Sequence, residues 1–255
     1  MKFVRFRRKE GSGLIRSGVL QDKAIREING NPLESWEWAD RSYDLAEVIL
    51  EAPVAPRHII GIGKNYLAPG EQRPERLPDI PVLFYKPSAS VIGTEEVIVL
   101  PPAVEEVKFE SELAVVIGKA AKHISELDVF QHVFGYTVAN DVTAFSMFHP
   151  DGHWTVGKMA DTFTPLGPVL ETELDLAQIR IRSHLNGELK QDSGLDNIIV
   201  GIAEMISYIS KYTTLYPGDV ILTGSPAGAE MMRNGDVIEC AIDGIGSLRN
   251  TVTAG

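Results

Sequence analysis

The chain is poor in cysteine, in long apolar runs and in positive charge. Its one cysteine, Cys240, excludes an intrachain disulfide and a zinc site built on several cysteines. Cys240 lies in the apolar run VIECAI, where we expect it to fill the core. No run of about 18 apolar residues occurs, which excludes a helical membrane span. The net charge of −11, from 24 Lys and Arg against 35 Asp and Glu, argues against non-specific nucleic-acid binding.

What is present is an ordinary globular composition, with 44% hydrophobic and 23% charged residues among 255. That length fits one large domain, or a large domain with a small one. The basic start of the chain lacks the apolar stretch of a signal peptide, so we expect a cytoplasmic protein. An acidic protein can still bind an anionic substrate, because a bound cation can reverse the field inside a cleft.

Short alternating runs separated by turn residues predict a mostly β chain with a few helices, which is an α+β fold. Residues 1–52 are predicted to form a small β-rich subdomain. The breakers Pro53 and Pro56 mark a boundary, after which residues 53–255 are expected to form the main domain.

Several local segments have their own signals. Residues 33–51 and residues 123–135 are each expected to contain a short helix, and residues 197–212 carry apolar side chains at clear helical spacing. Asn186-Gly187 predicts a tight hairpin turn. Residues 64–81 are rich in proline and charge, and a loop of this length is typical of a lid or a binding loop.

The centre of the chain carries two carboxylates at strand spacing. Glu110 and Glu112 flank Ser111 ahead of the apolar run LAVVIG, and alternate residues of a strand share one face. Two carboxylates side by side repel each other, and a hard cation such as Mg²⁺ removes that cost. Asp141, after another apolar run, is a third candidate ligand. A solvated strand edge is the alternative interpretation of such a pair taken alone.

Segments along most of the chain, from about residue 56 to the C-terminus, resemble the fumarylacetoacetate hydrolase family in content and order. They are GIGKNY, LFYKPSASVIG, FESELAVVIGK, GYTVANDVTA, WTVGKMADTFTPLGP, LNGELKQD, YPGDVILTGSPAG and GDVIECAIDGIGSLRN. The resemblance implies a mixed β-roll or β-sandwich with a small N-terminal β subdomain, and a homodimer. It also implies that Glu110, Glu112 and Asp141 bind Mg²⁺ or Mn²⁺.

Further positions match residues that lie near the substrate in the family. Lys158 would hold an anionic substrate oxygen and a developing enolate. Ser225 stands where the family usually has Thr, and it keeps a hydroxyl that can donate to a substrate oxygen. Lys86, Gln191 and Tyr66 are the remaining candidate substrate contacts, with structural roles as the alternative.

The sequence departs from the family at the residues that activate water. Pro69 and Gln72 occupy the positions of the family's lid His and Glu, and Phe145 replaces an Arg. Proline cannot take up a proton and neutral glutamine cannot polarise a base. These changes weaken the case for hydrolysis, which needs a general base.

Other residues could replace the missing base. His149 and His153 lie between the metal-ligand candidate Asp141 and Lys158 in the sequence, and either could act as an acid or base. Glu71 on the predicted lid is another candidate. Solvent-exposed loop residues are the alternative interpretation of both histidines.

These observations favour a metal-dependent enzyme that cleaves a C–C bond of a small 2-oxo or β-dicarbonyl acid. Because the lid pair is missing, we expect decarboxylation of the oxaloacetate type, in which a metal stabilises the enolate left by CO₂. The alternatives are hydrolysis of an acylpyruvate or fumarylacetoacetate, isomerisation of a 2-hydroxyhepta-2,4-diene-1,7-dioate type of substrate, and non-catalytic binding of a metal–dicarboxylate complex.

Overall fold

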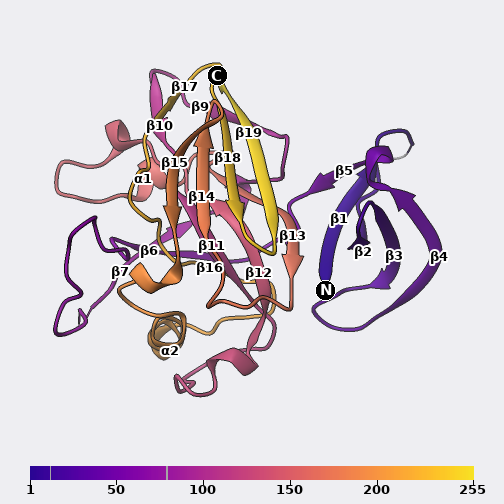
Figure 1. Cartoon of the computed structure of the whole chain (residues 1–255), viewed down its shortest axis with the longest axis horizontal. Coiled ribbons are helices and arrows are strands. Elements are labelled where there is room, and N and C mark those ends of the chain that lie inside the picture. Colours follow the sequence, from indigo (N-terminus) through magenta and orange to yellow (C-terminus); the bar gives the residue numbers. More distant parts are fainter. Residues whose placement is uncertain (12, 79) are drawn as a thin grey trace.

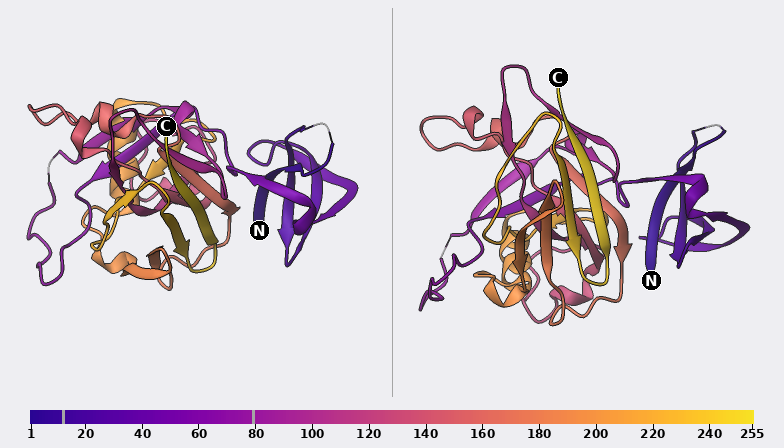
Figure 2. Two further views of the ribbon diagram at one scale, coloured as in Figure 1. Left: turned by 90° about the horizontal axis from the view of Figure 1, so that it is seen from above. Right: turned by 45° about the horizontal axis from the view of Figure 1, so that its top comes forward.

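The computed structural model describes residues 1–11, 13–78 and 80–255, which form a small and a larger β-rich body (Figure 1). The N-terminal strands stand apart from the larger body in each view of Figure 2. Phe6 and Ile25 are fully buried in the smaller body. Its strands are β1 (Lys2–Arg8), β2 (Arg16–Gln21), β3 (Ala24–Gly30), β4 (Trp36–Asp44) and β5 (Val48–Glu51).

The helix predicted within residues 33–51 is wrong. This segment forms β4, the single 3₁₀ turn η1 (Leu45–Glu47) and β5. Most side chains of β4 are exposed on both faces, so the strand has no buried alternate positions that would produce a period of two. Its pairing with β3 decides the conformation instead.

One sheet runs through both bodies, because β1 pairs with β13 at Lys2 and Phe3. Its central strand β11 is buried along its entire length, as expected of a strand covered on both faces. Strands β6 and β16 pair in parallel beside it. The strands of the larger body in this sheet are β6 (Ile59–Gly63), β7 (Val82–Lys86), β11 (Ser111–Ile117), β12 (Val133–Asn140), β13 (Thr164–Glu171) and β16 (Val220–Leu222), with the short β8 (Val91–Ile92) beside β13.

A second sheet packs against strands β11, β12 and β13 of the first. Its strands are β9 (Val97–Leu100), β14 (Ile181–Leu185), β15 (Glu188–Ser193), β18 (Val237–Ile242) and β19 (Gly246–Ala254), and a separate ribbon pairs β10 (Glu106–Lys108) with β17 (Met231–Arg233). Cys240 on β18 is buried as predicted, and burial raises the pKa of its thiol to about 12. The chain is therefore a mostly β, α+β fold with sheets packed face to face.

Helices are few in the described part of the chain. They are α1 (Thr155–Lys158) and α2 (Ile202–Tyr212), with 3₁₀ turns η2 (Ser88–Ser90), η3 (Val129–Gln131), η4 (Phe145–Met147) and η5 (Leu195–Asn197). Helix α2 confirms the helix expected within residues 197–212. The helix predicted within residues 123–135 is wrong apart from η3, because the backbone there forms separate three-residue turns, such as the Asp128 N–H to the Ser125 carbonyl at 3.1 Å, in place of successive α-helical bonds.

The predicted hairpin is confirmed as β14 and β15. Asn186 and Gly187 both have positive φ, at 53° and 84°, as a two-residue turn of this kind requires. Among the described residues, no helix has the length and apolar character needed to cross a membrane.

Candidate active site

A cleft of about 400 Å³ collects side chains from separate segments of the larger body. The first strand of that body, β6, brings Ile62 and Gly63 to its wall, and the loop that follows adds Lys64 and Tyr66. The start of β11, the end of β12, helix α1 and the loop after β16 provide further polar residues, namely Glu110, Glu112, Asp141, Lys158 and Ser225.

Strand pairing places the carboxylates. Ser111 on β11 lies opposite Asn140 on β12, so the residues just beyond each strand end, Glu110 and Asp141, meet. The Asp141 N–H donates to the Glu110 carbonyl at 2.9 Å, and Asn140 Oδ1 accepts from the Glu110 N–H at 2.9 Å. Glu110 and Glu112 both line the cleft, as the strand spacing indicates.

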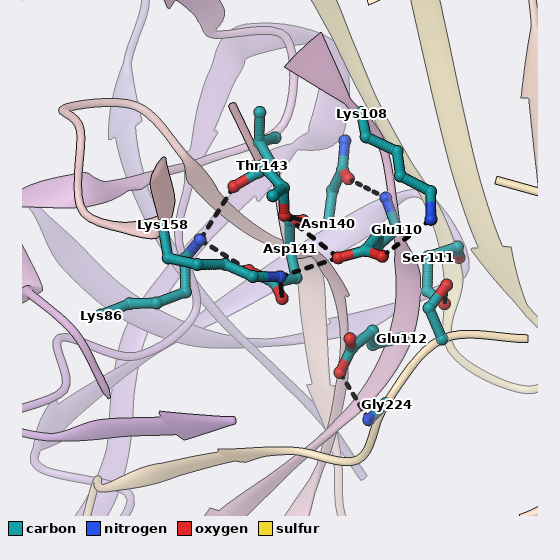
Figure 3. A network of polar contacts seen from close by, with 12 residues as sticks. Lys86, Lys108, Glu110, Ser111, Glu112, Asn140, Asp141, Thr143, Lys158 and Gly224 are labelled. Atoms are coloured by element: carbon teal, nitrogen blue, oxygen red, sulfur yellow. Dashed lines mark hydrogen bonds and ion pairs between the residues drawn. The ribbon is translucent and has the colours of Figure 1, made fainter. Parts of the chain in front are cut away.

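Two buried lysines hold Asp141 (Figure 3). The Lys86 Nζ donates to Asp141 Oδ1 at 2.6 Å and to the Val142 carbonyl at 3.1 Å. The Lys158 Nζ donates to the other Asp141 oxygen and to Glu110 Oε2, the latter at 2.8 Å. Lys158 therefore bridges the two carboxylates that terminate β11 and β12.

Burial and charge set the ionisation of this cluster. Burial would raise the pKa of Asp141, but the positive charges of Lys158 and Lys86 outweigh it and lower the pKa. Burial would lower the pKa of Lys158, but Asp141 and Glu110 hold it above its ordinary value. Burial prevails at Lys86 and lowers its pKa despite Asp141. Asp141 and Lys158 are therefore held as a charged pair inside the protein.

Glu112 is the carboxylate that lacks compensation. Its side chain accepts from the Gly224 N–H at 2.7 Å, and it forms no ion pair with any described residue. Burial, followed by the negative charges of Asp141 and Glu110, raises its pKa well above the ordinary value. A buried carboxylate beside two others gains free energy from a nearby cation.

This donor set suits a hard divalent cation in its chemistry, because it offers carboxylate oxygens only. Within the described residues, however, no three acidic, His or Cys side chains lie close enough to share one metal ion as they stand. The ammonium of Lys158 contacts Glu110 and Asp141, so it and a cation would compete for those oxygens. A metal ion bound by Glu110, Glu112 and Asp141 therefore stays a prediction, and it would require these side chains and Lys158 to move from their present positions.

The predicted substrate contacts fall into two groups. Ser225 and Tyr66 line the cleft. Gln191 is buried behind it, where its Nε2 donates to Ser225 Oγ at 2.8 Å and to the Pro226 carbonyl at 2.6 Å. Lys86 is also buried and reaches Asp141 rather than the cleft. Gln191 and Lys86 therefore position cleft residues in this arrangement.

The candidate bases do not line the cleft. His149 contacts Asp151 at 3.5 Å in an exposed loop, with His149 and His153 ring centroids 5.9 Å apart. Glu71 Oε2 accepts from the Ala68 N–H at 2.8 Å within its own exposed loop. A catalytic role for His149, His153 or Glu71 stays a prediction for which this structure provides no contact with the carboxylate cluster.

Aromatic side chains also line the cleft and were not predicted; the Lys158 Nζ lies 4.5 Å from the centre of the Phe84 ring. Phe148 and Trp154 stack with ring centroids 5.9 Å apart, and Phe84 and Phe145 also line the cleft. Gly63 lies against Trp154, since a Cβ on Gly63 would be 2.3 Å from the Trp154 ring. Phe145, Phe148 and Trp154 lie within ten residues of one another in the sequence, and this clustering is a signal that could have indicated them.

Lys64 at the cleft was also missed. It is exposed, has a positive φ of 58° and forms no ion pair with a described residue. A non-glycine residue in this region of φ is strained, and such strain concentrates at functional sites. Its place in the GIGKNY segment, two residues before Tyr66, is the available sequence signal.

Two known protein families match this chain. Residues 58–253 match the family described as fumarylacetoacetate (FAA) hydrolase C-terminal, and residues 1–53 match a family described as Rv2993c-like, N-terminal. The chain belongs to the fumarylacetoacetate hydrolase family, as the sequence motifs indicate.

Relatives in the family carry several activities. The rat (Rattus norvegicus) protein named oxaloacetate tautomerase Fahd2a, mitochondrial, is 39% identical over 81% of this chain and 70% of its own length. The structure of 5-carboxymethyl-2-hydroxymuconate delta-isomerase from Mycobacterium smegmatis is 34% identical with a TM-score of 0.92, covering 100% of both chains. Maleylpyruvate hydrolase from Sphingobium sp. SYK-6, in complex with manganese(II) and pyruvate, is 29% identical with a TM-score of 0.83, again over 100% of both chains.

Proposed function

We propose that this enzyme interconverts the keto and enol forms of a small 2-oxo dicarboxylic acid, with oxaloacetate as the representative substrate. The proposal rests on the residues that line the cleft. They include carboxylates and lysines, which can stabilise an enolate, and no histidine is among the described lining residues. Hydrolysis needs a base that deprotonates water, whereas enolate formation needs charge stabilisation and a proton carrier. The rat oxaloacetate tautomerase at 39% identity supports the same reaction.

The charge of the cleft supports a dianionic substrate. Its lining carboxylates Glu110, Glu112 and Asp141 are matched in number by the lining lysines Lys64, Lys108 and Lys158. Lys86, which contacts Asp141 from behind, adds one further positive charge. A negative substrate therefore meets a cleft in which Glu110 and Asp141 are paired with lysines, even though the whole chain carries −11.

Residues of this chain have defined tasks in the proposal. Glu110, Glu112 and Asp141 would hold Mg²⁺ or Mn²⁺, which when bound supplies Lewis acidity toward the 2-oxo oxygen. Lys158 neutralises negative charge that develops on that oxygen. The exposed ammonium of Lys64 binds the distal carboxylate of the substrate.

The aromatic side chains of the cleft contribute by excluding water. Stacked Phe148 and Trp154 close one side of the cleft and lower its effective dielectric. Electrostatic interactions with the enolate oxygen are stronger in such a setting than in water.

Decarboxylation of the same acid is the second candidate. It passes through an enolate too, formed when the C3–C4 bond breaks and CO₂ leaves, and it needs no activated water. The placement of Glu71, His149 and His153 outside the cleft favours it over hydrolysis. A homodimer and a cytoplasmic location remain predictions from the sequence.

The test is turnover by the purified protein with Mn²⁺ or Mg²⁺, each with and without EDTA. Decay of the ultraviolet absorbance of the enol of oxaloacetate measures tautomerisation, and pyruvate release measures decarboxylation. We expect metal-dependent tautomerisation faster than pyruvate release. Cleavage of acetylpyruvate without any effect on oxaloacetate would contradict the proposal and indicate a hydrolase. Binding of oxalate without turnover of either compound would indicate a non-catalytic binder.

A further inference from the structure

Four aromatic side chains form a continuous strip along the cleft. Phe145 packs edge-on against Phe148 with ring centroids 5.1 Å apart, and Phe148 stacks on Trp154 at 5.9 Å with the ring planes 15° apart. Trp154 in turn lies 6.1 Å from Phe84, again between ring centroids. All four residues line the cleft, so this aromatic strip borders the space that a substrate would occupy.

A lysine lies at each end of the aromatic strip. The Lys158 Nζ is 4.5 Å from the centre of the Phe84 ring, and the Lys108 Nζ is 5.5 Å from that of Phe145. The same two ammonium groups contact Glu110, at 2.8 and 3.2 Å. The strip therefore begins and ends beside the carboxylate cluster. A group attached to the reacting carbon of a substrate held at Lys158 can reach these rings.

The rings are accessible to a ligand. Phe145 is 46% exposed, Phe148 and Trp154 are half-buried, and Phe84 is buried. Apolar surface that is gathered in one cleft and left open to solvent is typical of a ligand site, because such surface in a core would be covered by other side chains. The strip therefore offers contact area that the carboxylates and lysines do not use.

The cleft is also larger than oxaloacetate requires. A cavity of about 150 Å³ holds one benzene molecule. Oxaloacetate has half as many heavy atoms again, and in proportion it needs about 225 Å³, against a cleft of about 400 Å³. The remaining space, about 175 Å³, is close to the room that a six-membered ring occupies.

We propose that the aromatic strip binds an aromatic ring carried on C3 of the substrate, so that the enzyme accepts 2-oxo acids of the phenylpyruvate class; this rests on the function proposed above. Phenylpyruvate and oxaloacetate share the 2-oxo acid and differ in the group on C3, for which the strip would bind the ring and Lys64 the carboxylate. The enol of an aryl-substituted acid is flat, and a flat ring stacks well on Phe148 and Trp154. One proton moves between the enol oxygen and C3, so no further reactant is needed.

The test is the binding of two unreactive mimics to the full-length protein, measured by calorimetry with Mn²⁺ present. Oxamate resembles the 2-oxo acid, and N-phenyloxamate adds a ring at the place of a C3 substituent. We expect N-phenyloxamate to bind the wild type about 10- to 100-fold more tightly than oxamate, because its ring leaves water for an apolar surface.

Substitutions in the strip should lower this ratio of affinities. We expect a decrease of about 2- to 12-fold in Phe148→Ala and in Trp154→Ala. The ratio matters because loss of a ring also admits water and weakens the binding of both mimics. Phe130→Ala and Trp38→Ala are the matched controls, because both residues are exposed, at 52% and 38%, and lie outside the cleft. The controls should keep the wild-type ratio.

Keto–enol interconversion of phenylpyruvate and of oxaloacetate, followed by ultraviolet absorbance, is the second measurement. We expect F148A to lower kcat/KM for phenylpyruvate more than kcat/KM for oxaloacetate. Thermal melts accompany both measurements. Phe148→Leu keeps an apolar side chain of similar bulk, and it repeats the comparison if the alanine variants do not fold.

The outcomes separate this proposal from the proposed function. A ratio of affinities near one in the wild type would overturn the ring subsite, while tautomerisation of oxaloacetate by the same protein would leave the proposed function standing. A high ratio that persists in folded F148A and W154A would mean that the ring binds elsewhere, which also overturns the subsite. A high ratio that depends on the strip, without turnover of either acid, would support the subsite and defeat the proposed function.

Discussion

The carboxylate cluster and the loop that carries His149 and His153 differ in how firmly the fold fixes their side chains. Glu112 and Asp141 are 2% and 1% exposed, and the register between β11 and β12 fixes the place of Glu112 on β11 and of Asp141 just after β12. The His149 side chain is 59% exposed and contacts only its own loop among the described residues. Buried charge costs free energy unless it is compensated, so the carboxylates of the cluster need partners such as Lys86 and Lys158, whereas the exposed loop has no such requirement.

Of the substitutions that test this comparison, Lys158→Met should have the largest effect on activity. Loss of the ammonium leaves a developing enolate without its fixed positive charge, and we expect kcat to fall by about 10²- to 10³-fold. Steady-state kinetics with oxaloacetate measure it, with the exposed Lys122→Met as control. A thermal melt must accompany the assay, since Glu110 and Asp141 each lose one of two lysine partners. Unchanged kcat in a folded K158M would show that the cluster is structural.

Lys64→Met should have the next largest effect. Without the exposed ammonium, the distal carboxylate loses a charge-assisted hydrogen bond of about 1.5–3 kcal/mol, which predicts a KM raised about 10- to 100-fold. The kcat should be retained, because the reacting atoms lie elsewhere. Lys64→Arg keeps the charge and should restore most of the affinity. An equal KM in wild type and K64M would remove the dicarboxylate from the proposed substrate class.

Glu112→Gln should raise the stability of the metal-free protein. Folding raises the pKa of Glu112, so its protonation stabilises the fold below the ordinary value of 4.5, and this contribution is lost as pH rises through the raised pKa. Glutamine mimics the protonated form, so the gain in Tm should be largest at neutral pH and vanish in acid. Each kcal/mol corresponds to about 2–4 °C.

Calorimetric melts of E112Q across this pH range, with the exposed Glu126→Gln as control, provide the measurement. Added Mn²⁺ should raise the Tm of wild type and leave that of E112Q unchanged. A neutral-pH Tm below that of wild type would mean that the Glu112 charge is already compensated in the metal-free protein.

The double variant His149→Ala, His153→Ala should have the smallest effect. Both side chains lie outside the cleft, so we expect kcat and KM for oxaloacetate within about 2-fold of wild type, as for surface substitutions away from a site. The same assay with Glu71→Ala extends the comparison to the other loop. A large loss of kcat would show that these loops close over the cleft during turnover.

Sequence reasoning succeeded where local chemistry decides the outcome. The period of α2 and the Asn186-Gly187 turn each encode their structure within a few residues. It failed at β4, whose side chains face solvent on both sides, so that pairing with β3 rather than periodicity made the strand. It also failed at residues 123–135, where separate turns closed by the N–H groups of Asp128 and His132 stand in place of continuous helical bonds.

In the site too, features with a local sequence signal were predicted, and features that depend on tertiary placement were not. Glu110, Glu112 and Asp141 could be placed together from strand spacing and family motifs, and they line one cleft. The Tyr66 hydroxyl is buried without a hydrogen-bond partner among the described residues, which could not be predicted, because it depends on what the rest of the fold places beside it. Lys64 depends likewise on tertiary placement, since nothing in its own chemistry distinguishes it from other lysines.

Gly63 packs closely against Trp154, so the size of the side chain at residue 63 affects the width of the cleft. A single methyl group at residue 63 would be 2.3 Å from the Trp154 ring and would push the indole aside, in the direction in which Trp154 and Phe148 are free to adjust. The room in the cleft beyond its carboxylates therefore depends on the size of residue 63, which has no ionisable or hydrogen-bonding side chain. An engineer who wished to change the length of the accepted acid, while sparing every ionisable group, would begin at that glycine.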